Sequence, residues 1–226
     1  MTDEVLDHHE LADLVEDLHA ADSAEQTAEQ IITRLCETVE MDRGGVTMIR
    51  GGGRLDTVSA TDDLIKKADE LQVALGEGPA RSDDWDETLR LGDLRRERRW
   101  PRWTKAVTDL GVASLLGVSL APSSRRIGVV TLYSEDTRFF DDDDVAFAHI
   151  FARHAAIALF RAEREENLEI ALDARKLIGQ AQGILMERYG LDEPRAFEVL
   201  RRYSQQHNLK LRAVARMLVE TRTLPS

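Results

Sequence analysis

Hydrophobic positions follow helical and strand-like periods in turn along the first part of the chain. Apolar residues three and four positions apart predict helices at 10–20, 24–39, 64–75 and 101–110. The second of these helices opens at Ser23–Gln26, which has the form of a capping box. Short apolar or alternating runs predict strands at 45–50, 54–60, 90–94, 114–120 and 128–133. Three glycines at 51–53 supply a turn, so the first two strands are expected to form a hairpin.

The C-terminal part of the chain reads as helix almost throughout. No proline interrupts 145–189, and helical spacing continues along it, which predicts one long helix. The stretch 161–169 inside it is mostly charged, and a helix that is polar on nearly all sides is stable when it bridges domains or pairs with its own copy. We therefore expect a helical linker that forms a parallel two-helix seam, a coiled coil, in a homodimer. Two shorter helices follow, the first opened by Asp192–Pro194 with Phe197 inward, the second with Leu211 inward.

A helical wheel divides the long helix around Gly179 into two faces. The inward face is apolar: Leu177, Ile178, Ala181, Ile184 and Leu185. The outward face is polar and bare: Arg175, Gly179, Gln182, Gly183 and Met186, flanked by Lys176 and Gln180. On the last helix, Arg212 and Arg216 lie one turn apart and are expected to point outward.

Two glycines on the outer side of a helix require a reason, because each costs about 1 kcal/mol relative to alanine. One interpretation is close approach by a folded RNA loop, whose phosphates favour Arg and Lys and whose splayed bases favour amides and flat contacts. The alternative is close packing against the next helix or against a partner helix. The two glycines alone do not decide between these interpretations.

Charge and composition narrow the class of protein. The 226 residues carry a formal net charge of −12, yet 171–226 holds ten basic and six acidic residues, a net of +4, against −16 for 1–170. An acidic body with a basic tail points modestly to nucleic-acid contact by the tail. A single cysteine, Cys36, excludes an internal disulfide and any multi-thiolate zinc site. No membrane span or signal peptide is recognisable, so we expect a reducing cytoplasmic compartment.

Three ordered segments of the tail resemble the ANTAR domain, a family of three-helix RNA-binding modules in bacterial transcription antitermination regulators. These segments are Ile178–Met186, Ala196–Phe197 and Asn208–Ala215, and the resemblance covers roughly 168–223. Together with the outward face of the wheel and the two arginines of the last helix, it predicts RNA contacts from the following residues: Arg175, Lys176, Gly179, Gln180, Gln182, Gly183, Met186, Arg212 and Arg216. Gln182 stands where the family often has Lys, which keeps a hydrogen-bonding group but loses a charge.

The first part is similar to a GAF domain of the kind joined to ANTAR in actinobacteria. The segments that carry this resemblance are Gly76–Pro79, Arg99–Pro101, Gly111–Ser114 and Ile127–Tyr133. The resemblance implies an α+β fold, with a central antiparallel sheet flanked by helices, and a sensory role for a small molecule or partner. Because Cys36 lies in the first helix of this domain, we do not expect a covalently attached bilin. His149 and His154 are expected to be structural or surface residues rather than haem ligands.

Together these observations predict an N-terminal helix at 1–22, a GAF domain at 23–160, a helical linker at 161–170 and an ANTAR domain at 171–226. The expected function is RNA-binding antitermination, in which the GAF domain controls binding of the ANTAR domain to tandem hairpin loops and so prevents a terminator. Two alternatives are a ligand-responsive DNA-binding factor that uses the C-terminal helices and a protein-interaction module. No phosphate loop, zincin or nucleophile-elbow motif occurs, so neither enzymatic activity nor a cofactor or metal is expected.

Overall fold

The computed structural model describes residues 23–83, 85–138 and 140–223, and the chain divides between Glu163 and Arg164 into two compact units. The helix expected at 10–20 lies outside the described residues. The N-terminal unit contains these elements: α2 (Ala24–Thr38), β1 (Arg43–Arg50), β2 (Arg54–Ala60), α3 (Asp63–Leu75), β3 (Thr88–Leu91), α4 (Pro101–Asp109), β4 (Ser114–Leu120) and β5 (Gly128–Ser134). Single 3-10 turns lie at Gly51–Gly53, Pro79–Arg81 and Leu94–Arg96. Helix α5 (Asp142–Tyr189) contributes residues to both units.

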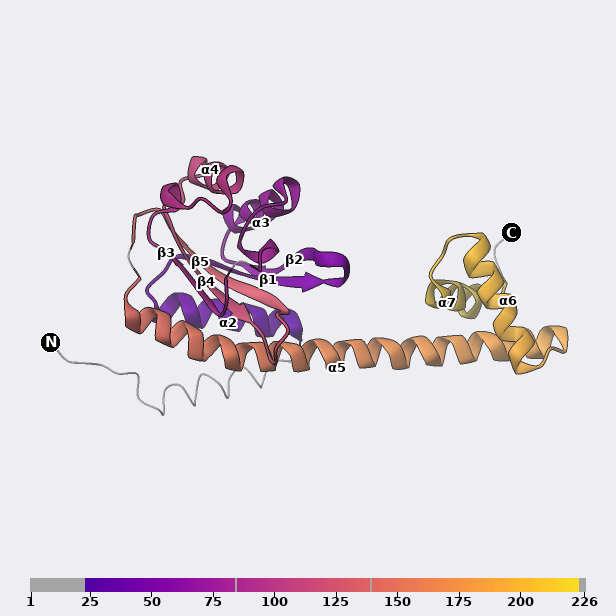
Figure 1. Ribbon diagram of the computed structural model, residues 1–226. Helices are drawn as coiled ribbons and strands as arrows, with labels where there is room; N and C mark the ends of the chain where they lie inside the picture. The colour runs from indigo at the N-terminus through magenta and orange to yellow at the C-terminus, as the bar shows by residue number, and fades with distance from the viewer. Residues whose placement is uncertain (1–22, 84, 139, 224–226) are drawn as a thin grey trace. The chain divides into compact units, whose positions relative to one another are not determined.

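The five strands form one antiparallel sheet in the order β2-β1-β5-β4-β3 (Figure 1). The predicted hairpin of β1 and β2 is confirmed, with Arg50 opposite Arg54 at the glycine turn. The strand expected at 90–94 is displaced: β3 ends at Leu91, and Leu94 is buried in a 3-10 turn instead. Its apolar side chain is needed under α4 rather than in the ladder, which is why the hydrophobic run extends past the strand. The α+β architecture is thereby confirmed.

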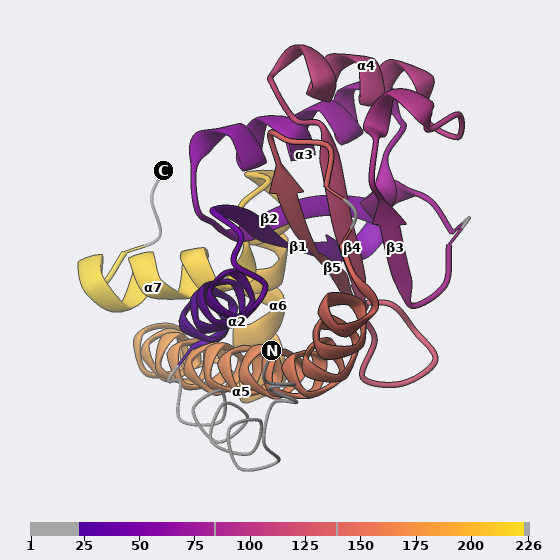
Figure 2. The same ribbon diagram turned by 90° about the vertical axis from the view of Figure 1, so that its left-hand side faces the viewer.

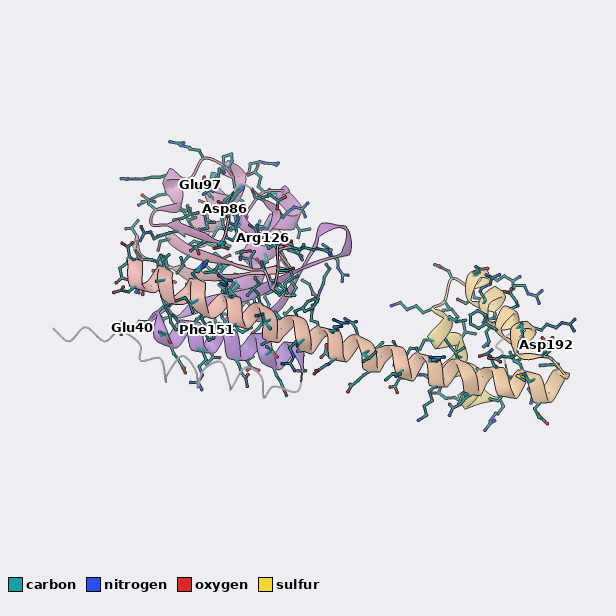
Figure 3. The ribbon with its side chains drawn as sticks, turned by 60° about the horizontal axis from the view of Figure 1, so that its bottom comes forward. Glu40, Asp86, Glu97, Arg126, Phe151 and Asp192 are labelled. Carbon is teal, nitrogen blue, oxygen red and sulfur yellow. The ribbon has the colours of Figure 1, made fainter. Side chains whose placement is uncertain are left out.

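Helices cover both faces of the sheet, α2 and α5 on one and α3 and α4 on the other (Figure 2). Side chains alternate between the two faces, as the two-residue period of a strand requires. In β5, Val130 and Leu132 pack against α2 and α5, whereas Val129 and Tyr133 pack against α3 and α4. Phe151, labelled in Figure 3, is fully buried on the sheet-facing side of α5.

Side-chain caps begin α2 and α3 in the N-terminal unit, and the first of them confirms the predicted capping box at Ser23. Ser23 Oγ accepts a hydrogen bond from the backbone N–H of Gln26 at 3.1 Å, which caps α2. Asp62 caps α3 in the same way through the N–H of Ile65, at 3.2 Å. Gly76 ends α3 in the left-handed conformation, at φ 67°.

The Gly76–Pro79 segment connects α3 to α4 through one carboxylate. Glu77 accepts hydrogen bonds from the backbone N–H groups of Arg102 and Trp103, at 2.8 and 3.2 Å, at the beginning of α4. It also pairs with the Arg102 guanidinium at 2.6 Å, and these bonds hold the pKa of Glu77 below its usual value. The segment is thus a structural clamp within the sensory unit.

Helix α5 is the one described helix long and apolar enough to cross a membrane by length and composition. Within its apolar window 44% of the residues are buried, and Ala148, Phe151, Ala155 and Leu159 pack into the core of the N-terminal unit. Burial and packing of this kind are typical of a core helix that covers a sheet.

The C-terminal unit is a three-helix bundle built from the end of α5, α6 (Glu193–Gln206) and α7 (Leu211–Thr221). Its core consists of Ala181, Leu185, Ala196, Leu200, Val214, Ala215 and Leu218. Gly190 follows α5 with φ 62°, a left-handed conformation that favours glycine at a helix end. Asp192, labelled in Figure 3, caps α6 through the N–H of Arg195 at 3.0 Å.

Candidate nucleic-acid interface

The outward face predicted around Gly179 is present and open in the C-terminal unit. Gly179 and Gly183 are exposed, and a Cβ added to either would meet no neighbouring atom within 4 Å. Neither has a positive φ. Neither backbone conformation nor packing against α6 and α7 therefore requires glycine here, and the chain's own contacts do not support the interpretation in which these glycines let α6 approach.

Basic side chains, which bind anions, and an amide side chain, which forms hydrogen bonds, lie close to the two glycines. Arg175, Lys176 and Gln180 are exposed on α5, and Met186 is 37% exposed. Arg216 is exposed on α7. We call the set Arg175, Lys176, Gly179, Gln180, Gly183 and Met186 the glycine face.

Two of the predicted site residues are less open than the wheel indicated. Gln182 is half-buried, because its Nε2 donates a hydrogen bond to the carbonyl oxygen of Glu193 at 3.2 Å, at the start of α6. Arg212 is also half-buried, and its Nε is shielded from solvent without a hydrogen-bond partner among the described residues. A helical wheel describes one helix at a time, so it does not show that α6 begins beside Gln182.

The expectation that Phe197 points inward is wrong. Ala196 and Leu200 fill the bundle core, but Phe197 is 36% exposed and lies outside the buried cluster. Consecutive residues on a helix are separated by 100°, so Ala196 and Phe197 cannot both face the core centre. Phe197 instead lines a groove between α5 and the beginning of α6, a neighbourhood that the sequence pattern alone did not indicate.

The same exposed side of α5 carries apolar residues before the glycine face. Leu168 and Leu172 are 61% and 59% exposed, and they precede Arg175 and Gly179 by one heptad each. A helix surface with two such leucines is typical of a helix that pairs with another helix. The glycine face therefore follows a stretch suited to self-association.

The interior of the N-terminal unit holds a buried carboxyl group. Asp69 accepts hydrogen bonds from the hydroxyls of Thr47 and Thr57, at 2.5 and 2.7 Å, and from the amide of Gln72 at 2.9 Å. Burial raises the pKa of Asp69, against the opposing effect of these bonds. The Gln72 side chain in turn accepts the N–H of Ala80, so the network links the sheet, α3 and the segment after it.

Three other side chains of this unit that are capable of binding a ligand are one thiol and two imidazoles. Burial, together with Asp42 and Glu37, raises the pKa of the Cys36 thiol to about 11, so it is protonated and unreactive at neutral pH. His149 lies 3.2 Å from Glu87 and 3.3 Å from the Thr88 hydroxyl, and His154 is exposed. Within the described ranges no three His, Cys, Asp or Glu side chains come together to hold a metal ion.

Family models match both parts of the chain. A GAF domain model matches residues 21–159, more than half of the sequence, and an ANTAR domain model matches 166–219. The chain is a GAF–ANTAR protein. Since GAF domains are sensory modules and ANTAR domains are RNA-binding modules of antitermination regulators, this GAF–ANTAR protein has the domain organisation of a transcription regulator.

Solved structures resemble this GAF–ANTAR protein in fold. A domain of a two-component sensor histidine kinase protein from Sinorhizobium meliloti has 17% identity and a TM-score of 0.56, over 66% of this chain and 99% of that one. The GAF domain of a phosphoenolpyruvate-protein phosphotransferase from Coxiella burnetii has 20% identity and a TM-score of 0.56, over 70% and 94%. The Stigmatella aurantiaca phytochrome photosensory core module has 11% identity and a TM-score of 0.58, over 90% and 46%. No curated protein sequence matches the chain.

Proposed function

We propose that this protein is a dimeric antitermination regulator whose two ANTAR bundles hold two hairpin loops of a nascent RNA. Loops held in this way cannot refold into the overlapping terminator, so transcription continues. The GAF domain, in response to a small molecule or a protein partner, controls how the two bundles are presented to the RNA. The RNA-binding residues are those of the glycine face, with Gln182, Arg212 and Arg216 as supporting contacts.

The observation that carries the proposal is the open space above Gly179 and Gly183. A helix that keeps two glycines at a cost of about 1 kcal/mol each, without a packing need, is consistent with a ligand that approaches its backbone. The exposed Arg175 and Lys176 beside them supply cations for phosphates. The net charge of +4 over 171–226, on a chain that is acidic elsewhere, supports an anionic ligand for the bundle.

The dimer is supported by the exposed leucines of α5. Leu168 and Leu172 lie on one side of the helix, where burial against a second α5 would remove them from water. In a dimer the second hairpin binds within the same complex, at an effective concentration on the order of millimolar. Two hairpins in one RNA are therefore expected to bind much more tightly than one.

The proposal is tested with the full-length protein and a two-hairpin RNA, measured at several salt concentrations. We expect tighter binding to the two-hairpin RNA than to a scrambled RNA duplex of equal length, and more read-through of a terminator that overlaps the second hairpin during transcription in vitro. Equal affinity for both RNAs would rule the proposal out. A footprint on palindromic DNA without RNA preference would favour the DNA-binding alternative instead.

A further inference from the structure

A groove in the C-terminal unit lies between α5 and the beginning of α6, and its size suits a small planar ligand. Its volume of about 640 Å³ is comparable with that of small-molecule sites, but the groove is broadly open to solvent rather than enclosed. The residues that line it are Ala171, Ala174, Arg175, Ile178, Gln182, Glu193, Pro194 and Phe197. The groove is therefore apolar along its floor and polar at a few positions, and it shares Arg175 with the glycine face.

Phe197 is the feature of the groove that the bundle itself does not explain. The hydrophobic core is complete without it, since Ala196 and Leu200 of the same helix are fully buried. At 36% exposure, Phe197 leaves a substantial aromatic surface in contact with water on a small three-helix unit. An exposed aromatic ring that lines a groove is a platform on which a second planar group can stack.

Two charged side chains line the groove, the cation of Arg175 and the carboxylate of Glu193. Arg175 is exposed and makes no ion pair within the part of the chain that the structure describes, so its guanidinium is available to an anionic group. The amide of Gln182 is fixed by its bond to the Glu193 carbonyl, so it holds a defined position beside the apolar floor. A free guanidinium next to an aromatic ring and an amide complements a nucleotide, which joins an anionic phosphate to a flat base with polar edges.

We propose that one unstacked base of each bound RNA loop enters this groove and stacks on Phe197, while Arg175 binds the phosphate beside that base. The inference rests on the RNA-binding function proposed above and makes it specific: the bundle reads a base that the loop turns outward, as well as the loop's backbone. Such stacking tolerates different bases, because every base has a flat face. Phe197 and Arg175 then belong to one binding subsite, formed by α6 and α5 together.

The test uses the full-length protein and the two-hairpin RNA, with the fluorescent base 2-aminopurine placed at each loop position in turn. With the wild-type protein, we expect quenching at one loop position. Phe197→Leu keeps an apolar side chain but removes the ring, and we expect about ten- to hundred-fold weaker binding and loss of that quenching. Phe197→Trp keeps an aromatic ring and should retain both the affinity and the quenching of the wild type.

A control is available on the same unit. Tyr189 is 63% exposed on α5, more than Phe197, and does not line the groove, so Tyr189→Leu removes an exposed aromatic ring elsewhere. We expect this variant to bind RNA and quench like the wild type. Circular dichroism of each variant shows whether the bundle is folded; should Phe197→Leu unfold, the affinity and quenching of Phe197→Trp decide the question.

The outcomes separate this inference from the function on which it rests. Wild-type protein that fails to prefer the two-hairpin RNA contradicts the proposed function itself. RNA binding that is intact in Phe197→Leu, or Phe197→Trp that is folded but neither binds nor quenches, overturns the base-stacking inference and leaves RNA binding in place. A change in oligomeric state of Phe197→Leu without RNA, measured by sedimentation, would show that a second copy of the chain occupies the groove, which also overturns it.

Discussion

Adding one methyl group to each glycine of the glycine face should make the bundle more stable and its RNA binding weaker. Gly179→Ala and Gly183→Ala place a Cβ where no neighbouring atom lies within 4 Å, in a helix whose φ values suit alanine. Within the protein the substitutions therefore cost nothing. If an RNA loop rests on the backbone at this point, each methyl group occupies space that the loop needs.

The two effects have opposite signs and measurable sizes. Alanine in place of glycine inside a helix stabilises it by about 0.5–1 kcal/mol per site. For a unit of this size each kcal/mol corresponds to a rise in Tm of about 4–8 °C. Loss of one direct RNA contact costs about 1–3 kcal/mol, so we expect RNA affinity to fall by roughly one order of magnitude or more.

Hydrogen exchange of the full-length protein, followed over 164–226, measures the stability of the bundle, and titration with the two-hairpin RNA measures its affinity. Gly190→Ala is the matched control. Its Cβ would also meet no neighbouring atom, but its φ of 62° is left-handed, so the same chemical change should destabilise the bundle.

Two results would show that RNA does not rest on the glycine face. Variants that are more stable yet bind the two-hairpin RNA as tightly as the wild type would show that RNA does not approach these backbones. Variants that lose the dimer in sedimentation, but bind a single hairpin normally, would show that Gly179 and Gly183 lie in the seam between two copies of α5. Arg175 and Gly179 lie seven residues after Leu168 and Leu172, so a coiled coil formed through the two leucines would continue into the glycine face.

Arg175→Ala should weaken RNA binding and reduce the slope of log affinity against log salt by about 1, whereas Arg125→Ala, which removes an exposed charge from the N-terminal unit, should change neither. Leu168→Glu combined with Leu172→Glu should give a monomer by sedimentation that retains single-hairpin affinity and loses the advantage of two hairpins; a dimer that persists would place the seam elsewhere. Glu77→Gln should lower the Tm of the N-terminal unit at pH 7, because the lowered pKa of Glu77 gives stability that is present above its ordinary value of 4.5 and lost as the pH falls through its folded value. The Tm difference between this variant and the wild type should shrink below pH 4.5, and a constant difference would contradict the role of the carboxylate.

Most of the fold follows from local chemistry that a sequence displays directly. Ser23, Asp62 and Asp192 begin helices because their side chains accept backbone N–H groups close to them in the chain. The strands at 114–120 and 128–134 show the apolar runs of a buried sheet. The displacement of β3 does not follow from such local signals, because the burial of Leu94 depends on how α4 packs over it.

The sequence predicts only those features of the candidate site that depend on a single helix. The open glycines and the exposed Arg175 follow from the periodicity of α5 alone, and the structure places them as the wheel did. Gln182 and Phe197 depend on how α6 packs on α5, which periodicity does not encode. Both residues meet at the groove, so the part of the site formed by two helices is the part that required coordinates.

Ultraviolet crosslinking of the full-length protein to the two-hairpin RNA, mapped by mass spectrometry, shows whether RNA contacts the glycine face. We expect crosslinked peptides that contain residues 175–186, and none above background with the scrambled duplex. Crosslinks confined to the N-terminal unit or to α7, with 175–186 free of them, would contradict RNA contact with this face.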